Sequence, residues 1–122
     1  MIPNVVMAVL VVPILKRGSK MIKLTEQNYD AETGKGTFVA LISASWCGKC
    51  SAFKPAFNVL GTKMEGVGFG IANVAEDESL SDKLNVTNLP TTIVYKEGKE
   101  VGRTTEMKSV DSMKEWIEGL TK

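Results

Sequence analysis

From Met21 onward the chain alternates between strand-like and helix-like stretches, and this order constrains the fold more than any other feature. The apolar and β-branched runs predict strands at 21–24, 37–44, 67–75, 91–95 and 100–104. The helical periodicities and their end signals predict helices at 26–32, 47–63, 77–84 and 109–120. Early alternation implies parallel strands, and the late hairpin adds antiparallel ones. We therefore predict an α/β fold with a central mixed β-sheet flanked by helices on both faces.

Several residues mark the ends of these elements. Thr25 is a suitable N-cap for the first helix, and Pro55 is expected to kink or break the second. The segment Lys96-Glu97-Gly98-Lys99 predicts a hairpin turn in which Gly98 takes a positive φ. The last helix is predicted to be amphipathic, with one apolar face made of Val110, Met113, Trp116, Ile117 and Leu120.

Length and composition indicate one ordinary globular domain. The 122 residues are enough to build a hydrophobic core, and 43% of them are hydrophobic while 24% are charged. Because 15 basic and 14 acidic residues leave a formal net charge of +1, we predict no nucleic-acid partner. Histidine is absent, which removes the commonest general base and the commonest metal ligand.

Residues 1–20 differ from the rest of the chain. Ile2 to Leu15 is almost wholly apolar, and the basic residues Lys16, Arg17 and Lys20 follow it. This run is too short for an ordinary membrane-spanning helix, and its charges lie on the wrong side for a secretory signal. Three interpretations stay open: an upstream extension with Met21 as the effective start, a membrane-associating or atypical export segment, and an extra strand or helix packed on the domain. We divide the chain into an apolar N-terminal extension, 1–20, and a domain, 21–122.

The two cysteines of the chain lie in Trp46-Cys47-Gly48-Lys49-Cys50, at the junction of a predicted strand and a predicted helix. Two thiols at this spacing can close a small disulfide ring and open it again. Unpaired backbone N–H groups at a helix start favour a thiolate on the first sulfur, and the thiolate is the reactive form. The pattern therefore favours thiol–disulfide exchange.

Two other uses of the cysteines fit less well. A structural bridge between Cys47 and Cys50 would close so small a loop that it would restrain the unfolded chain little. Tetrahedral zinc requires four ligands, and the chain offers two thiolates and no imidazole, so only a dimer-bridged or carboxylate-completed site would serve. We predict no metal and no cofactor.

Several motifs in residues 21–122 resemble the thioredoxin family. Trp46-Cys47-Gly48-Lys49-Cys50 matches the active-site pattern of the family, with Lys49 where thioredoxins usually have proline. Further motifs in the expected order are Leu24-Thr25 with Asn28-Tyr29-Asp30, Pro55 in the active-site helix, and Asn88-Leu89-Pro90-Thr91-Thr92. The last segment resembles the one that carries the cis-proline of the family, here Pro90. The resemblance implies the thioredoxin fold.

The resemblance also implies a function and a set of site residues. As a protein-disulfide reductase, the protein would use Cys47 as the nucleophile and Cys50 as the resolving thiol. Trp46, Gly48, Lys49 and Pro90 would support the site, and Trp46, Leu89 and Pro90 would contact the substrate.

The expected partners are protein disulfides and a thioredoxin reductase or another dithiol donor, and we expect a cytoplasmic monomer without membrane contact. The alternatives are an oxidant or isomerase outside the cytosol, exported or membrane-associated through residues 1–20, and a binding subunit in which the cysteines are incidental.

Three positions depart from the family pattern. Thioredoxins usually bury an aspartate six residues before the first cysteine, and Leu41 stands there. Ser43 replaces a common aromatic residue, and 105–107 has no counterpart of the glycine that lines the substrate groove of the family. Because the chain also lacks histidine, water or a lysine would have to relay the proton. We predict slower resolution than in a standard thioredoxin, and a faster rate after Leu41→Asp.

Overall fold

The computed structural model describes residues 21–122, so the predictions made for residues 1–20 lie outside the described part of the chain. The strands are β1 (Met21–Leu24), β2 (Thr37–Ser43), β3 (Val67–Asn73), β4 (Thr91–Lys96) and β5 (Lys99–Thr104). The helices are α2 (Tyr29–Thr33), α3 (Gly48–Lys63), α4 (Glu78–Leu84) and α5 (Val110–Thr121). The order of the elements confirms the predicted alternation.

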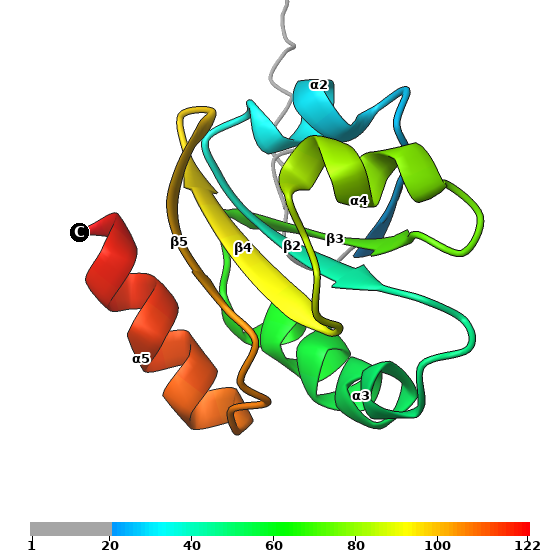
Figure 1. Ribbon diagram of the computed structural model, residues 1–122. Helices are drawn as coiled ribbons and strands as arrows, with labels where there is room; N and C mark the ends of the chain where they lie inside the picture. The colour runs from blue at the N-terminus through cyan, green and yellow to red at the C-terminus, as the bar shows by residue number, and fades with distance from the viewer. Residues whose placement is uncertain (1–20) are drawn as a thin grey trace, which may run out of the picture.

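The five strands form one mixed sheet in the order β1-β3-β2-β4-β5. β1, β3 and β2 are parallel to one another, and β4 runs antiparallel to both β2 and β5. Helices α2 and α4 cover one face of the sheet, and α3 and α5 cover the other (Figure 1). The predicted α/β fold is therefore confirmed.

The central strand β2 contributes to a hydrophobic core on each face of the sheet. Phe38, Ala40 and Ile42 belong to the cluster under α2 and α4, whereas Val39 and Leu41 belong to the cluster under α3 and α5. All five side chains are fully buried. A parallel strand covered on both faces requires an apolar residue at every position, which explains the unbroken apolar run in the sequence.

The prediction for the start of α2 is wrong. Thr25 does not cap this helix, which begins at Tyr29 with Asn28 at the N-cap position. Instead, the backbone N–H of Thr25 donates to Asn28 Oδ1 at 2.7 Å, and the N–H of Asn28 donates to Thr25 Oγ1 at 3.3 Å. These reciprocal bonds close a turn over residues 25–28, because short polar side chains can satisfy backbone groups without a helix.

The helix α3 continues through Pro55, so of the two predicted effects, a kink or a break, the break does not occur. A proline inside a helix costs about 3 kcal/mol because it lacks an N–H group and its ring crowds the preceding turn. Phe53 and Phe57 lie on either side of Pro55 and are both buried against the sheet. Tertiary packing supplies most of the stability of helices in proteins, and here it holds the two halves of α3 together.

The C-terminal elements agree with their predictions. The turn between β4 and β5 consists of Glu97 and Gly98, with φ values of 53° and 83°, so Gly98 takes the predicted positive φ. In α5, Met113 and Ile117 are fully buried, and the rest of the predicted apolar face packs against the same cluster.

The strand β3 ends at Asn73, two residues before its predicted end at 75. The side chain of Asn73 turns the chain there, because its Oδ1 accepts the N–H of Ala75 at 3.1 Å.

Candidate active site

Cys47 and Cys50 lie at the start of α3, where the chain has just left β2. Cys47 is the N-cap residue and has an extended backbone, with φ −94° and ψ 112°. Its Sγ accepts the backbone N–H of Cys50 at a distance of 3.2 Å, as an N-cap side chain does. Both thiols are free. The sulfur of Cys47 is therefore held against unpaired donors of the first helical turn, at the junction that the sequence predicted.

The two thiols differ in exposure and in acidity. Cys47 is partly exposed, whereas Cys50 is completely buried. Burial alone would raise the pKa of Cys47, but hydrogen bonds from the Cys50 thiol and from the N–H groups of Cys50 and Lys49, with the Lys49 charge, lower it overall. Burial raises the pKa of Cys50 to about 11, and its hydrogen bond to Cys47 adds to this effect. The arrangement concentrates negative charge on the accessible sulfur.

A surface pocket of about 370 Å³ opens beside Cys47. Its lining combines the indole of Trp46 with apolar and small polar side chains: Trp46, Cys47, Val74, Ser81, Val86, Thr87, Asn88 and Leu89. Trp46 is 72% exposed, so most of its ring is available to a bound molecule. We refer to this space as the Trp46 pocket. It offers an apolar surface next to the more acidic sulfur.

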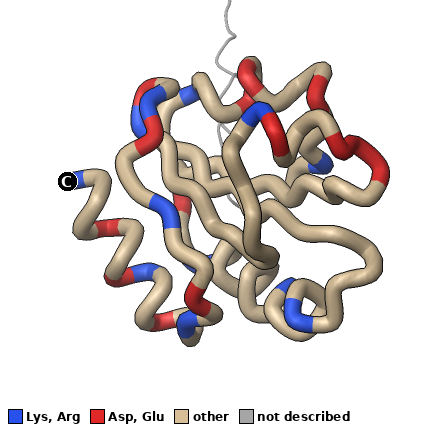
Figure 2. Tube along the Cα trace, in the orientation of Figure 1, with Lys and Arg blue, Asp and Glu red and all other residues tan. Residues whose placement is uncertain are grey.

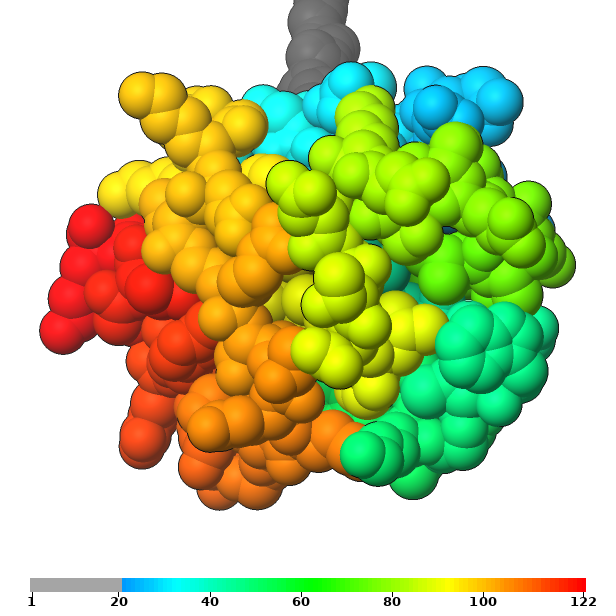
Figure 3. All heavy atoms as spheres, viewed as in Figure 1, coloured from blue at the N-terminus to red at the C-terminus, as the bar shows by residue number. Residues whose placement is uncertain are grey.

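A second pocket, of about 390 Å³, lies on the other side of the segment that enters β4. It is lined by Lys49, Asn88, Leu89, Pro90, Thr105 and Met107, and we call it the Lys49 pocket. Asn88 and Leu89 line both pockets and therefore separate them, and the Leu89–Pro90 peptide bond is cis. Figure 3 shows this face, where the teal start of α3, the yellow-green segment before β4 and the orange segment after β5 meet.

The structure brings most of the predicted site residues together. Trp46, Cys47 and Leu89 share the Trp46 pocket, while Lys49 and Pro90 share the Lys49 pocket with Leu89. Cys50 is buried within the first turn of α3. Gly48 lines neither pocket, and a Cβ atom at this position would meet nothing within 4 Å. The space around Gly48 therefore does not require a glycine.

Several lining residues were not predicted from the sequence. Val86 and Asn88 come from the connection between α4 and β4, and Thr105 and Met107 from the connection between β5 and α5. The side chain of Met107 is 43% exposed, so it adds an accessible apolar surface to the Lys49 pocket. The sequence signals were the motif 88–92, which contains Asn88, and the departure at 105–107 from the family pattern.

The surroundings of Leu41 offer no buried carboxylate. Leu41 itself is fully buried, and the buried polar side chains within residues 21–122 are those of Thr33, Ser43, Thr91 and Thr92. The hydroxyl of Ser43 donates to the carbonyl of Ala72 at 3.0 Å and so bridges β2 and β3. A proton that leaves Cys50 therefore has no buried carboxylate to receive it among the described residues.

A lysine does lie near the buried thiol. Lys54 follows Cys50 by four residues on α3, which places both side chains on neighbouring positions of one helix face. Lys54 is half-buried, and its positive charge lowers the pKa of Cys50, against the larger effect of burial. Water or an unspecified lysine was the predicted proton relay, and Lys54 is the lysine whose charge acts on Cys50.

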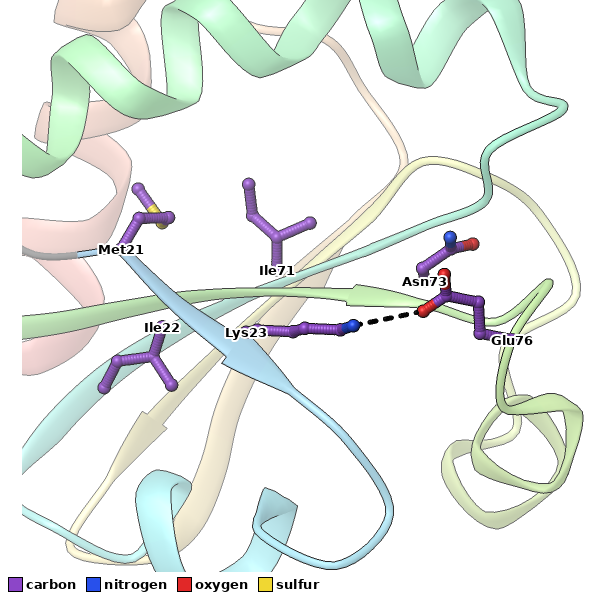
Figure 4. Close-up of a pocket in the computed structure, with 6 residues that line it drawn as sticks. All are labelled: Met21, Ile22, Lys23, Ile71, Asn73 and Glu76. Carbon is purple, nitrogen blue, oxygen red and sulfur yellow. Dashed lines mark ion pairs between the residues drawn. The ribbon is translucent and has the colours of Figure 1, made fainter.

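A third pocket lies away from the cysteines, beside the edge strand β1 (Figure 4). It is lined by Met21, Ile22, Lys23, Ile71, Asn73 and Glu76, and an ion pair of 3.4 Å joins Lys23 to Glu76 at the surface. Within residues 21–122, no cluster of three or more histidine, cysteine or acidic side chains is arranged to hold a metal ion. None of the helices in this range has the length and hydropathy needed to cross a membrane.

Comparison with known sequences identifies relatives over most of the chain. The family model described as Thioredoxin matches residues 20–119. A thioredoxin of Chlamydia caviae is 29% identical over 94 residues, which cover 76% of this chain and 92% of the relative. A thioredoxin of Bacillus subtilis is 29% identical over 98 residues, which cover 80% of this chain and 94% of the relative.

Comparison with solved structures gives the same fold. A mutant thioredoxin from Halobacterium salinarum matches with a TM-score of 0.78 at 21% identity, over 87% of this chain and 95% of the other. Thioredoxin F from spinach chloroplast, in its long form, matches with a TM-score of 0.73 at 24% identity, over 84% of this chain and 87% of the other. At these identities the structural matches establish the fold alone.

Proposed function

This chain belongs to the thioredoxin family of thiol–disulfide oxidoreductases, and from that premise we propose that it reduces protein disulfides through Cys47 and Cys50. The observation that carries the proposal is the difference between the two thiols. Cys47 is accessible and has a lowered pKa, whereas Cys50 is buried and has a raised one. An accessible thiolate beside a protected thiol suits a two-step exchange.

In the first step the Cys47 thiolate attacks one sulfur of a substrate disulfide. A bond forms between Cys47 and that sulfur, the substrate S–S bond breaks, and the second substrate sulfur leaves as a thiolate. The exposed ring of Trp46 and the backbone around Leu89 and Pro90 would hold the substrate chain beside Cys47. Cys50 is less suited to this role because its sulfur is buried and its pKa is raised.

In the second step Cys50 loses its proton and attacks the sulfur of Cys47. The Cys47–Cys50 disulfide forms, the mixed disulfide breaks, and the substrate leaves with both sulfurs reduced. A Cys47 sulfur bonded to substrate carries no charge, so the effect of the Cys47 thiolate on the pKa of Cys50 is removed at this stage. Burial still opposes the Cys50 thiolate, and Lys54 favours it. Because no buried carboxylate among the described residues receives the proton, we expect this step to be the slower one.

The reduced pair must then be regenerated. The cycle moves two electrons from Cys47 and Cys50 to the substrate, so an external dithiol donor such as a thioredoxin reductase has to return them. Such a cycle fits a reducing compartment, and we therefore propose that the protein acts in the cytoplasm. We propose separately that it is a monomer.

The proposal is tested by the reduction of insulin with dithiothreitol as the electron source. We expect the wild type to accelerate the reaction and Cys47→Ser to abolish the acceleration. Cys50→Ser, the matched variant, retains the attacking thiol and should accumulate a mixed disulfide that mass spectrometry detects. Equal activity of the wild type and Cys47→Ser would refute the proposal, and trapping by Cys47→Ser alone would reverse the two roles.

The midpoint potential of the Cys47–Cys50 pair distinguishes a reductase from an oxidant. A reductase should have a potential more negative than that of the cytosolic glutathione pool, about −240 mV. A clearly more positive potential would instead favour the oxidant or isomerase alternative. A protein that neither reduces nor oxidises disulfides would be a binding subunit.

A further inference from the structure

We propose that Lys49 makes this site prefer disulfides flanked by acidic residues. The inference rests on the proposed function and adds a substrate class to it. Lys49 lines the pocket between the first turn of α3 and the segment 88–90. Among the described residues that line the Trp46 and Lys49 pockets, it is the one basic residue, and apart from the Cys47 thiolate no lining side chain carries a charge. A substrate chain that enters these pockets therefore meets one fixed positive charge and no carboxylate.

The charge of Lys49 is available to a ligand. Its side chain is exposed, and it forms no ion pair within residues 21–122. One acidic residue, Glu106, lies in the chain between two lining residues, Thr105 and Met107. Glu106 is already paired with Lys108 at 2.8 Å, and this contact offsets its charge. A carboxylate on the substrate would thus not have to displace an existing partner of Lys49.

The other charged side chains of helix α3 have the same sign as Lys49. Helix α3 contains Lys49, Lys54 and Lys63 and no acidic residue, and the N-terminal end of a helix adds a partial positive charge. Acidic residues gather around α2 and α4 on the other face of the sheet, and α5, on the same face as α3, carries both signs, with Asp111, Glu115 and Glu118 beside Lys114 (Figure 2). The positive field at the start of α3 also balances the Cys47 thiolate, which would otherwise repel an acidic substrate.

The geometry of an extended chain defines which substrate positions are affected. An extended peptide advances about 3.3 Å per residue, so residues one or two positions from the attacked cysteine lie within about 7 Å of it. A surface ion pair changes a binding or rate constant by about two- to fivefold. We therefore expect acidic residues at these positions to raise kcat/KM by about this factor, and basic residues to lower it by a similar one.

The test uses three cyclic disulfide peptides that differ only in carrying Glu, Gln or Lys on both sides of one cysteine. The rate constant for reduction by the protein is divided by the rate constant for reduction by dithiothreitol, which removes the intrinsic reactivity of each peptide. For the wild type we expect the order Glu, Gln, Lys, with about a two- to fivefold step between neighbours. In about 0.5 M NaCl the ratio of rate constants between neighbouring peptides should fall towards one, because the salt shortens the screening length to about 4 Å.

Two variants assign the preference to Lys49. Lys49→Glu should reverse the order, whereas Lys63→Glu, which makes the same charge change about 21 Å away at the other end of α3, should keep it. A change in the pKa of Cys47 would alter the rates for all three peptides by one factor, so it would leave their ratios intact. An unchanged order in Lys49→Glu, or equal rates for the three peptides in the wild type, would overturn this inference alone. A failure to reduce any peptide would overturn the proposed function with it.

Discussion

Replacing Leu41 with aspartate should speed the resolving step of the exchange reaction. Leu41 lies in the same buried cluster as Phe53, which follows Cys50 by one helical turn. A carboxylate at this position would provide the proton acceptor that the described core lacks. General-base assistance typically contributes about a hundredfold or more, and we expect at least about a tenfold gain, equivalent to about 1.4 kcal/mol in the barrier.

The same substitution should be costly for stability. Leu41 is fully buried between Ile71 of β3 and Thr92 of β4. Truncating a buried leucine costs about 2–5 kcal/mol, and an unpartnered polar group adds about 1–3 kcal/mol. We expect a total loss of about 3–8 kcal/mol in the free energy of unfolding, measured by urea denaturation. A typical domain has about 5–15 kcal/mol, so cooling and a stabilising buffer should keep the variant folded during the assay.

The stability of Leu41→Asp should also depend on pH in a defined direction. Burial raises the pKa of a carboxyl group above its unfolded value of about 4. The folded variant then binds the proton more tightly than the unfolded chain does. Its stability relative to the wild type should therefore be greatest below about pH 4 and should fall as the pH rises through the folded pKa, by at most about 1.4 kcal/mol per pH unit.

Rapid mixing with acid quench and mass spectrometry measures the decay of the mixed disulfide directly. Leu41→Asn is the matched control, because asparagine resembles aspartate in shape and polarity but has no carboxylate that could accept a proton. We expect Leu41→Asp to resolve the mixed disulfide faster than both the wild type and Leu41→Asn. Equal decay rates in the two variants at neutral pH would refute the reasoning about the missing carboxylate.

Three further predictions concern the thiols and the packing of the sheet. Iodoacetamide at neutral pH should alkylate Cys47 well before Cys50. Digestion with trypsin measures this, because it cleaves after Lys49 and places the two cysteines on different peptides. Equal labelling of the two cysteines would contradict their assigned pKa directions. Tyr29→Phe should lower the free energy of unfolding by about 1–2 kcal/mol, because it breaks the buried 2.7 Å bond between the Tyr29 and Tyr95 hydroxyls, and a double-mutant cycle with Tyr95→Phe should show coupling. Gly70→Ala should cost about 1–3 kcal/mol in urea denaturation, since its Cβ would lie 3.0 Å from the carbonyl oxygen of Ile22, whereas Gly119→Ala, which meets nothing within 4 Å, should be neutral or stabilising.

The sequence predicted the elements with a strong hydrophobic period and missed those fixed by distant contacts. β2 was predicted almost to the residue because an unbroken apolar run of this length is typical of a strand buried on both faces. The start of α2 was missed because Thr25 and Asn28 are equally suitable caps. The choice between them is coupled to Tyr29, whose buried hydroxyl meets that of Tyr95, 66 residues further along the chain. No local pattern contains that contact.

The candidate site shows the same division. Cys47, Cys50 and their helix start are a local motif, so spacing alone was enough to single them out. Lys54 was missed although it lies four residues from Cys50, because its effect depends on the burial of that thiol. Met107 was missed because the segment after β5 reaches the site only through the order of strands in the sheet.

The two halves of the site are anchored to the fold in different ways. Cys47 and Val86, which line the Trp46 pocket, pack against the hydrophobic cluster beneath α2 and α4, as does Leu89, which lies between the two pockets. Lys49 and Met107 are exposed and belong to neither cluster. Substitutions of Lys49 or Met107 would therefore change the preference for substrates without a large loss of stability. Substitutions of Cys47 or Val86 would destabilise the fold, and selection would remove them for that reason.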